Sequence, residues 1–154
     1  MRDRLNKDIQ TSMKSGDKTR LSTLRLMHAA IKERDLSIQG SAGQSPQEDK
    51  ISDLEILSVF QKMVKQRRES IDIFRKAGRN DLADKENQEI LIIEDYLPQQ
   101  MNEEQIKKTI DALMEELQIS SVKDMGRAMG ALKTRHSGMM DFSKASTYLK
   151  QVLK

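Results

Sequence analysis

FQKMVKQRRESIDIFRKAGRNDLADKENQEILIIEDYLP, residues Phe60–Pro98, predicts two long helices that fold back on each other. On either side of Gly78, residues recur at alternating spacings of four and three, which places them along one face of a helix. Gly78 ends the first helix because glycine takes the left-handed conformation readily, and Pro98 marks the end of the second. Asp81 is the expected N-cap of the second helix. The two stripes are Phe60, Val64, Arg67, Ile71 and Phe74, and Leu82, Glu86, Glu89, Ile93 and Tyr96.

Charged residues interrupt both apolar stripes near their middle. Folding the two helices antiparallel about Gly78 places Arg67 opposite Glu89. An unpaired charge in a packed seam would be costly, whereas an arginine that faces a glutamate is tolerated. We therefore expect an Arg67–Glu89 ion pair that sets the register of the hairpin. The alternative is that both side chains reach past the seam into solvent.

The composition indicates a helical chain with a modest core. Of its 154 residues, 36% are hydrophobic and 33% are charged, which is typical of a soluble protein and not of a disordered one. The absence of cysteine excludes disulfides, thiolate metal sites and a cysteine nucleophile. No run approaches the roughly 18 apolar residues of a membrane span, and the N-terminus lacks the apolar region of a secretory signal. We therefore expect a cytoplasmic protein with no membrane association and no cofactor.

The helices are expected to form two groups. Four predicted helices precede Pro98 and three follow it. The predicted fold is therefore all-α, with a four-helix bundle over residues 1–97 and a three-helix bundle over residues 98–154. The short segment around Pro98 is the expected linker because it separates parts of the chain with different charge balance.

Capping signals predict where four of the helices begin. Asp17 can cap the second helix, and Ser45–Glu48 has the pattern of a cap, a proline and a glutamate that reaches back to the cap. Asn102 followed by Gln105 resembles a capping box. Asp141 is the expected cap of the last helix.

Both ends of the chain are basic. Residues 1–35 hold nine lysine and arginine residues against five acidic ones, and residues 121–154 hold seven against two. The net charge of +3 is too small by itself to indicate a nucleic-acid-binding protein. The distribution of charge is therefore the more informative feature.

The second helix of the C-terminal group contains two glycines, Gly126 and Gly130, one turn apart. Because each interior glycine costs a helix about 1 kcal/mol relative to alanine, two in one helix require an explanation. In the functional interpretation, the bare strip admits a phosphate–sugar backbone, which the flanking Lys123, Arg127 and Lys133 contact. In the packing interpretation, a neighbouring helix lies close against the glycines.

Three stretches of the chain resemble one known family. Lys65–Pro98 resembles the signature of the YqeY family of small bacterial proteins, and Asp17–Asp35 and Asp124–Lys133 match the same family. The matches lie in order along nearly the whole chain. That family is similar to the C-terminal tail of the GatB subunit of the tRNA-dependent amidotransferase. The resemblance implies a four-helix unit followed by a three-helix unit.

The resemblance also implies a partner. In GatB the matching tail contacts tRNA, so tRNA is the expected partner, and the turn at Arg135–His136 joins the flanking cations as an expected contact. This chain departs from the family pattern at Met139 and Met140, where many members have proline and a more basic, glycine-rich turn. The two methionines weaken the RNA inference for that turn. The expected nucleic-acid-binding residues are Lys123, Gly126, Arg127, Gly130, Lys133, Arg135 and His136.

The sequence contains no recognisable catalytic constellation. Its paired acids are adjacent residues that do not face each other on a helix, and it lacks phosphate-loop, metalloprotease and nucleophile-elbow motifs. A glutamine-dependent carbon–nitrogen ligase label would belong by resemblance to the larger subunit, whose catalytic part this chain lacks. We therefore expect a non-catalytic tRNA-associated module. The alternative is an adaptor that binds the amidotransferase or translation proteins through exposed Met139 and Met140 and the last helix.

Overall fold

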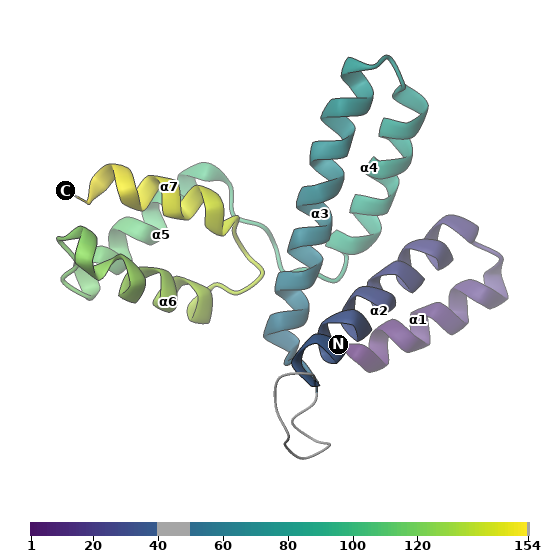
Figure 1. The fold of residues 1–154 in the computed structure, drawn as a ribbon, viewed down its shortest axis with the longest axis horizontal. Coiled ribbons are helices and arrows are strands. Elements are labelled where there is room, and N and C mark those ends of the chain that lie inside the picture. The colour runs from purple at the N-terminus through teal and green to yellow at the C-terminus, as the bar shows by residue number, and fades with distance from the viewer. Residues whose placement is uncertain (40–49, 154) are drawn as a thin grey trace. The chain divides into compact units, whose positions relative to one another are not determined.

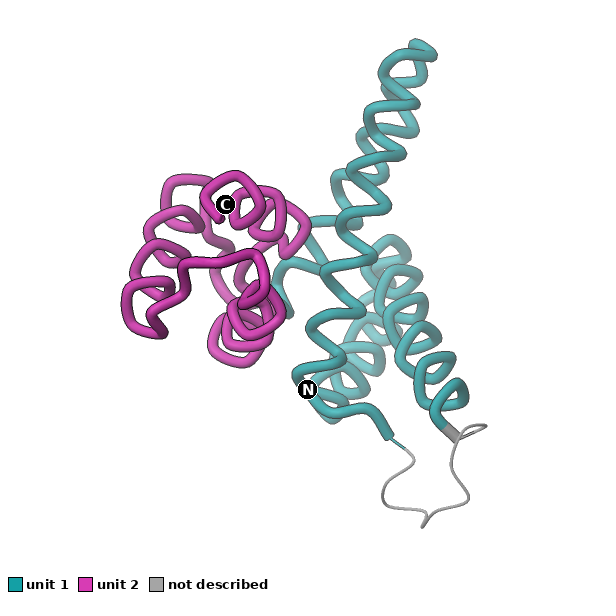
Figure 2. The backbone as a smooth tube through the Cα atoms, turned by 60° about the vertical axis from the view of Figure 1, so that its left-hand side comes forward, with its two compact units in different colours: residues 1–97 teal, residues 98–154 magenta. Residues whose placement is uncertain are grey.

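The computed structural model describes residues 1–39 and 50–153. These residues form seven α-helices and one short 3-10 helix without any strand, which confirms the all-α class. The chain divides into two compact units, Met1–Leu97 and Pro98–Lys154 (Figure 2). None of the described helices is long and apolar enough to cross a membrane.

Unit 1, Met1–Leu97, consists of two helical hairpins (Figure 1). The first contains α1 (Arg2–Ser15) and α2 (Lys18–Gln39). The second contains α3 (Asp53–Lys76) and α4 (Asn80–Glu94), and α2 packs against both of its helices. The largest fully buried side chains of this unit belong to Leu5, Leu24, Met27, Ile31, Ile56, Phe60 and Ile93.

The α3–α4 hairpin turns at Gly78, as the sequence predicts. Gly78 has a φ of +70°, the left-handed conformation that glycine adopts without steric cost. Its N–H donates to the carbonyl of Arg75, and the N–H of Arg79 donates to the carbonyl of Phe74. The expected cap at Asp81 is wrong. The cap residue of α4 is Arg79, and Asp81 lies in the first turn of the helix, where its carboxylate oxygens accept two hydrogen bonds of 3.1 Å from the Arg79 guanidinium.

Arg67 and Glu89 form an ion pair in the seam of this hairpin. Nε and Nη2 of Arg67 lie 3.0 and 2.9 Å from Glu89 Oε2, and Nε lies 4.0 Å from Glu86 Oε2. The two paired side chains are only 13% and 9% exposed, so they do not reach past the seam into solvent. Nη1 of Arg67 also donates to the carbonyl of Met63 at 3.3 Å, so all three guanidinium nitrogens are bonded within the hairpin.

Tyr96 fixes the end of the hairpin to α1. Its ring packs edge-on against Phe60 with the ring centroids 6.0 Å apart, and its hydroxyl donates to the Asp8 carboxylate. The Arg4 guanidinium lies 4.3 Å from the centre of the Tyr96 ring. Burial, followed by the hydrogen bond to Asp8, raises the pKa of the Tyr96 hydroxyl well above its ordinary value. The hydroxyl therefore remains a proton donor.

A capping box starts α3. Ser52 Oγ accepts the N–H of Glu55, and the Glu55 carboxylate accepts the N–H of Ser52 at 2.9 Å. The start predicted at Ser45–Glu48 lies outside the described residues, and the described helix begins at Asp53. The other predicted caps are confirmed because each accepts a backbone N–H of its helix: Asp17, Asn102 and Asp141.

Asp35 joins three segments of unit 1. Its carboxylate accepts two hydrogen bonds from the Arg2 guanidinium and one from the N–H of Ile51, each 2.8 Å long. Arg2 also donates to the carbonyl of Ile51 at 3.0 Å. Burial alone would raise the pKa of Asp35, but the hydrogen bonds from Arg2 and Ile51 outweigh burial and hold the pKa below its ordinary value. This clamp attaches the start of α1 and the approach to α3 to the end of α2.

Asp35→Asn is expected to lower the free energy of unfolding by about 2 kcal/mol at neutral pH, because the charged hydrogen bonds with Arg2 are lost. The folded-state pKa of Asp35 lies below the reference value of 3.8. The contribution of the ionised carboxylate to the free energy of unfolding is therefore complete above that value and disappears as the pH falls through the folded-state pKa. Urea unfolding should separate variant and wild type at about pH 7, and the difference should shrink progressively as the pH falls below 3.8. Asp84→Asn, at an exposed position, is the control, and a pH-independent difference for Asp35→Asn would contradict the clamp.

Unit 2 contains three α-helices: α5 (Glu103–Glu116), α6 (Met125–Arg135) and α7 (Phe142–Val152). A single turn of 3-10 helix, η1 (Val122–Asp124), precedes α6. α7 packs against both α5 and α6. The core between the helices consists mainly of aliphatic side chains: Ile106, Ile110, Leu113, Ala128, Leu132, Met140, Ala145 and Leu149.

Candidate nucleic-acid interface

One face of α6 is buried and the opposite face is open to solvent. Ala128 and Leu132, four residues apart, are fully buried in the core of unit 2. Gly126 and Gly130 lie roughly half a turn away around the helix axis, and both are exposed. The helix is thus anchored by one stripe and presents the glycines outward.

No neighbouring helix covers the two glycines. Apart from the chain neighbours and the nearby backbone of α6 itself, no heavy atom of the described structure lies within 4 Å of a Cβ atom built on Gly126 or Gly130, and neither residue has a positive φ. The packing interpretation is therefore wrong for this helix. Neither crowding nor backbone conformation requires glycine at these positions, so their cost of about 1 kcal/mol each has no structural explanation.

Two lysines continue the bare face at both ends. Lys123 lies three residues before Gly126, and Lys133 lies three residues after Gly130, so the four residues follow one helical stripe. Both lysine side chains are exposed, and neither has an ion pair or hydrogen bond to any residue in 1–39 or 50–153. We call these four residues, Lys123, Gly126, Gly130 and Lys133, the glycine strip.

Arg127 borders the glycine strip but is partly engaged by its own chain. One of its guanidinium nitrogens donates to the carbonyl of Leu117 at 2.6 Å and lies 4.0 Å from a carboxylate oxygen of Asp124. The side chain is nevertheless 56% exposed. Since a guanidinium carries five N–H donors, Arg127 retains donors for a second partner.

Arg135 lies on another face of α6 than the glycine strip, and His136 follows the last residue of the helix. Arg135 lies about half a turn from Gly126 around the helix and donates two hydrogen bonds to the Glu116 carboxylate, at 2.6 and 2.8 Å. The hydrogen bond from Arg135 lowers the pKa of Glu116, as expected for a bidentate pair. His136 is the C-cap residue of α6, where its N–H donates to the carbonyl of Leu132. The structure therefore assigns these two residues to the closure of unit 2.

Met139 and Met140 are not the exposed contact that the adaptor hypothesis expected. Met140 is 1% exposed and belongs to the core of unit 2. Met139 is half-buried, and its carbonyl accepts the N–H of Met101 at 2.7 Å. This correction removes the two methionines from the adaptor's proposed contact surface and leaves only the surface of the last helix.

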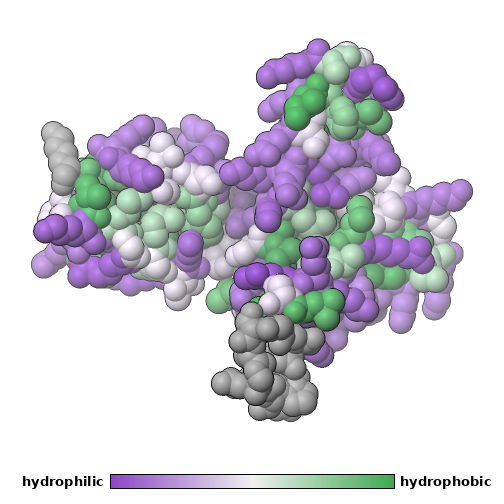
Figure 3. All heavy atoms as spheres, viewed as in Figure 1, coloured by the Kyte–Doolittle hydropathy of each residue, from purple (hydrophilic) through white to green (hydrophobic). Residues whose placement is uncertain are grey.

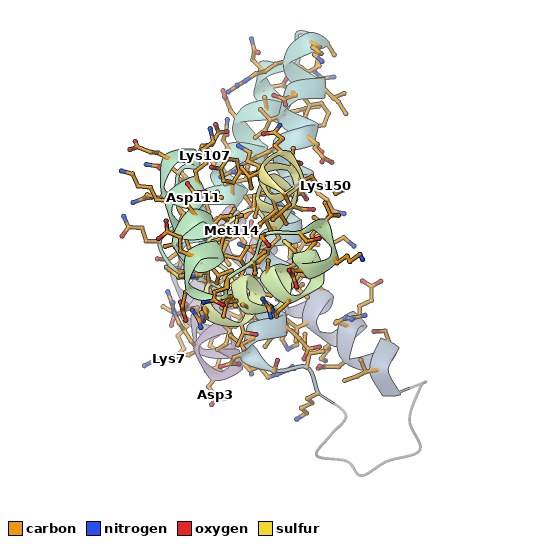
Figure 4. All side chains as sticks on the ribbon, turned by 90° about the vertical axis from the view of Figure 1, so that its left-hand side faces the viewer. Asp3, Lys7, Lys107, Asp111, Met114 and Lys150 are labelled. Atoms are coloured by element: carbon orange, nitrogen blue, oxygen red, sulfur yellow. The ribbon has the colours of Figure 1, made fainter. Side chains whose placement is uncertain are left out.

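A polar group on α5 and α7 was not apparent from the sequence. Figure 4 shows Lys107 and Asp111 projecting from α5. The Tyr148 hydroxyl of α7 donates to Asp111 at 3.0 Å, and Lys107 Nζ lies 5.7 Å from the centre of its ring. Beside this group is a surface pocket of about 330 Å³ that includes Ile106 and Lys144. These contacts join residues far apart in the chain, so periodicity within one helix does not reveal them.

Unit 1 exposes single hydrophobic side chains. Figure 3 shows hydrophobic residues at the surface near the free end of the α3–α4 hairpin. Ile73, in the last turn of α3, is 65% exposed, and Leu91 on α4 is 68% exposed. Isolated apolar residues are normal on the surface of a folded protein, so they do not define a binding site. Among the described residues, no group of three or more histidines and acids could hold a metal ion.

Comparison with known proteins gives a family and several relatives. The profile of the family described as Yqey-like protein matches residues 2–153. "Altered inheritance of mitochondria protein 41, mitochondrial" of Lachancea thermotolerans is 30% identical over 119 residues, which are 76% of this chain and 59% of the relative. The protein of that name in Pyrenophora tritici-repentis is 30% identical over 138 residues, 86% of this chain and 71% of the relative. An uncharacterized protein of Schizosaccharomyces pombe is 34% identical over 95 residues, 62% of this chain and 70% of the relative.

These relatives change two expectations. The relatives from Lachancea thermotolerans and Pyrenophora tritici-repentis are named as mitochondrial, which contradicts the expectation of a cytoplasmic protein. They are fungal proteins, whereas the resemblance implied a bacterial family. Their names mention neither tRNA nor an amidotransferase. The aligned part of this chain spans about three-fifths of the Lachancea thermotolerans relative, so that protein has a considerable further length.

Proposed function

This chain belongs to the YqeY family, and on that premise we propose that it is a non-catalytic RNA-binding module whose glycine strip holds the phosphate–sugar backbone of tRNA. The strip runs from Lys123 in η1 along α6, with the exposed Gly126 and Gly130 between Lys123 and Lys133. A phosphate backbone fits such a surface because no Cβ atom keeps it away from the helix, while ammonium groups at both ends meet its charge. The open surface above the glycines is the observation that carries the proposal.

The strip is suited to the RNA backbone rather than to bases. Specific recognition of unpaired bases relies on aromatic side chains for stacking, and the strip has none. Lysine contacts to phosphate position an RNA without reading its sequence. The choice of tRNA among the RNAs rests on the sequence resemblance to the GatB tail, which implies a contact with tRNA. Arg127, which borders the strip with part of its guanidinium still free to donate, would add a third cation.

Lys123→Gln combined with Lys133→Gln is expected to weaken tRNA binding about tenfold at low salt and to reduce the salt dependence. Each lost phosphate contact removes about 0.7 to 0.9 from the slope of log affinity against log salt, so two contacts remove about 1.4 to 1.8. The matched control is Lys107→Gln with Lys108→Gln, which removes the same charge from exposed positions of α5. Filter binding at several salt concentrations measures both quantities. Equal slopes for the two double variants would contradict the proposal.

Gly130→Leu is expected to reduce tRNA binding at least as much as the two lysine substitutions, because the new side chain holds the backbone away from both ends of the strip. The helix should remain intact, since leucine is a good helix former and the position faces open space. Ala112→Leu places the same side chain at an exposed position of α5 and is the control. Unchanged binding by a normally folded Gly130→Leu variant would contradict the proposal. Turnover of glutamine with mischarged tRNA by this chain alone would contradict its non-catalytic part.

A further inference from the structure

α2 carries a second row of unpaired cations, in unit 1. Lys18, Arg25 and Lys32 are separated by seven residues each, which is close to two helical turns, so they share one face. All three side chains are exposed. None of them has an ion pair or hydrogen bond to another residue of the described parts of the chain. We call Lys18, Arg25 and Lys32 the α2 cation row.

Small side chains lie between the cations of this row. Ser22 and Ala29 occupy the same face, four residues after Lys18 and Arg25 respectively, and both are exposed. Successive cations are about 10.5 Å apart along the helix axis, and the side chains between them are small. The row therefore has the same design as the glycine strip on α6, in which unpaired cations border residues with little or no side chain.

The acidic residues near the row do not neutralise it. Asp35 is buried and accepts hydrogen bonds from Arg2 and Ile51. Asp17 lies at the start of α2, where its carboxylate accepts the N–H of Arg20. Glu33 is about 100° around the helix from Lys32, so it borders the row from one side. The face retains a net positive charge.

We propose that the α2 cation row is a second contact surface for a nucleic-acid phosphate backbone, separate from the glycine strip. The phosphates of a nucleic acid follow each other more closely than 10.5 Å, so each cation of the row can meet a phosphate without a fixed register. Anionic membranes are bound by helices that also insert a continuous apolar face, whereas the exposed large apolar side chains of α2 are two separate residues, Leu26 and Leu36. The cores of protein interfaces are depleted of charge and enriched in aromatic residues, which this row lacks.

The test removes the row and compares the effect with an equal loss of charge elsewhere in unit 1. The row variant combines Lys18→Gln, Arg25→Gln and Lys32→Gln. The control variant combines Arg75→Gln, Lys76→Gln and Lys85→Gln, three exposed cations on α3 and α4. Both variants lower the net charge of the full-length chain by three. Binding of a fluorescein-labelled tRNA transcript is measured between about 50 and 200 mM salt, where phosphate contacts change affinity strongly.

The row variant is expected to lose about 2 to 3 from the slope of log affinity against log salt, and about tenfold in affinity at low salt. The control variant should stay close to wild type. Ser22→Glu with Ala29→Glu keeps all three cations but places acids between them, so it should weaken binding to a similar degree. Circular dichroism confirms that each variant folds. If the row variant and the control variant bind alike, the proposal is overturned.

Two further comparisons separate this inference from the proposed function. If the row variant loses affinity for tRNA while Lys123→Gln with Lys133→Gln does not, the α2 cation row is supported as a binding surface. The same result contradicts the proposed function of the glycine strip. Vesicles containing phosphatidylserine provide the second comparison. If the row variant loses vesicle binding while its tRNA binding is unchanged, the partner is a membrane surface and the nucleic-acid proposal is overturned.

Discussion

Arg67→Met is expected to lower the free energy of unfolding by about 3 to 5 kcal/mol, because it leaves Glu89 buried beside no positive charge. The Glu89 side chain is only 9% exposed, and its ion-pair partner Arg67 also lies 4.0 Å from the Glu86 carboxylate. Methionine keeps most of the length of the arginine side chain, so lost packing contributes little. The loss is measured by urea unfolding of the full-length chain, followed by circular dichroism.

Two companion variants identify the cause. Arg67→Met with Glu89→Leu removes both charges and should recover most of the lost stability, since replacing a buried ion pair by apolar residues is often neutral. Arg68→Met disrupts the neighbouring pair with Glu94, whose arginine is 63% exposed, and should cost less than about 1 kcal/mol. An Arg67→Met variant as stable as Arg68→Met would show that the seam does not bury the charge.

Gly126→Ala with Gly130→Ala is expected to stabilise unit 2 by about 2 kcal/mol, because each alanine gains about 1 kcal/mol over glycine within a helix. Nothing in the described structure opposes the added methyl groups. For a unit of this size, a gain of this magnitude raises the midpoint of thermal unfolding by about 10 °C, which calorimetry detects. Such a gain would show that neither glycine is required for the stability of α6.

Gly138→Ala provides the matched control in the same unit. Gly138 has a φ of +75°, a conformation that costs an L-residue roughly 1 to 2 kcal/mol. The same chemical change should therefore destabilise unit 2 at Gly138 and stabilise it at Gly126 and Gly130. If the alanines on α6 were destabilising, a close contact over the glycines would be implied, and the open strip would not exist.

The features that the sequence predicted correctly are those decided within one helix or one turn. Gly78 ends α3 in the expected conformation, and Asn102 with Gln105 forms the expected capping box, because both depend on neighbours a few residues away. Arg67 and Glu89 are 22 residues apart, yet their pairing follows from two helical stripes that meet at one tight turn. Asp81 was misassigned because α4 already begins at Asn80, which places Asp81 inside the first turn of the helix.

The candidate site was only partly predictable for the same reason. The spacing of Gly126 and Gly130 places them on one face, but only the packing of unit 2 decides whether that face is covered. Arg135 has the charge of an RNA contact, and its pairing with Glu116, 19 residues away, depends on how α5 and α6 lie together. Met140 likewise reads as exposed in a polar turn, although the core of unit 2 encloses it.

The hydrogen-bonded tyrosines also give the molecule a pair of built-in optical probes. The chain has two tyrosines and no tryptophan, and Tyr96 lies in unit 1 while Tyr148 lies in unit 2. Each phenol is bonded to a carboxylate of its own unit, Asp8 and Asp111 respectively, so loss of either unit releases one chromophore to water. Tyr148→Phe would leave a tyrosine signal from unit 1 alone, so the melting of that half of the chain could be followed without any attached label.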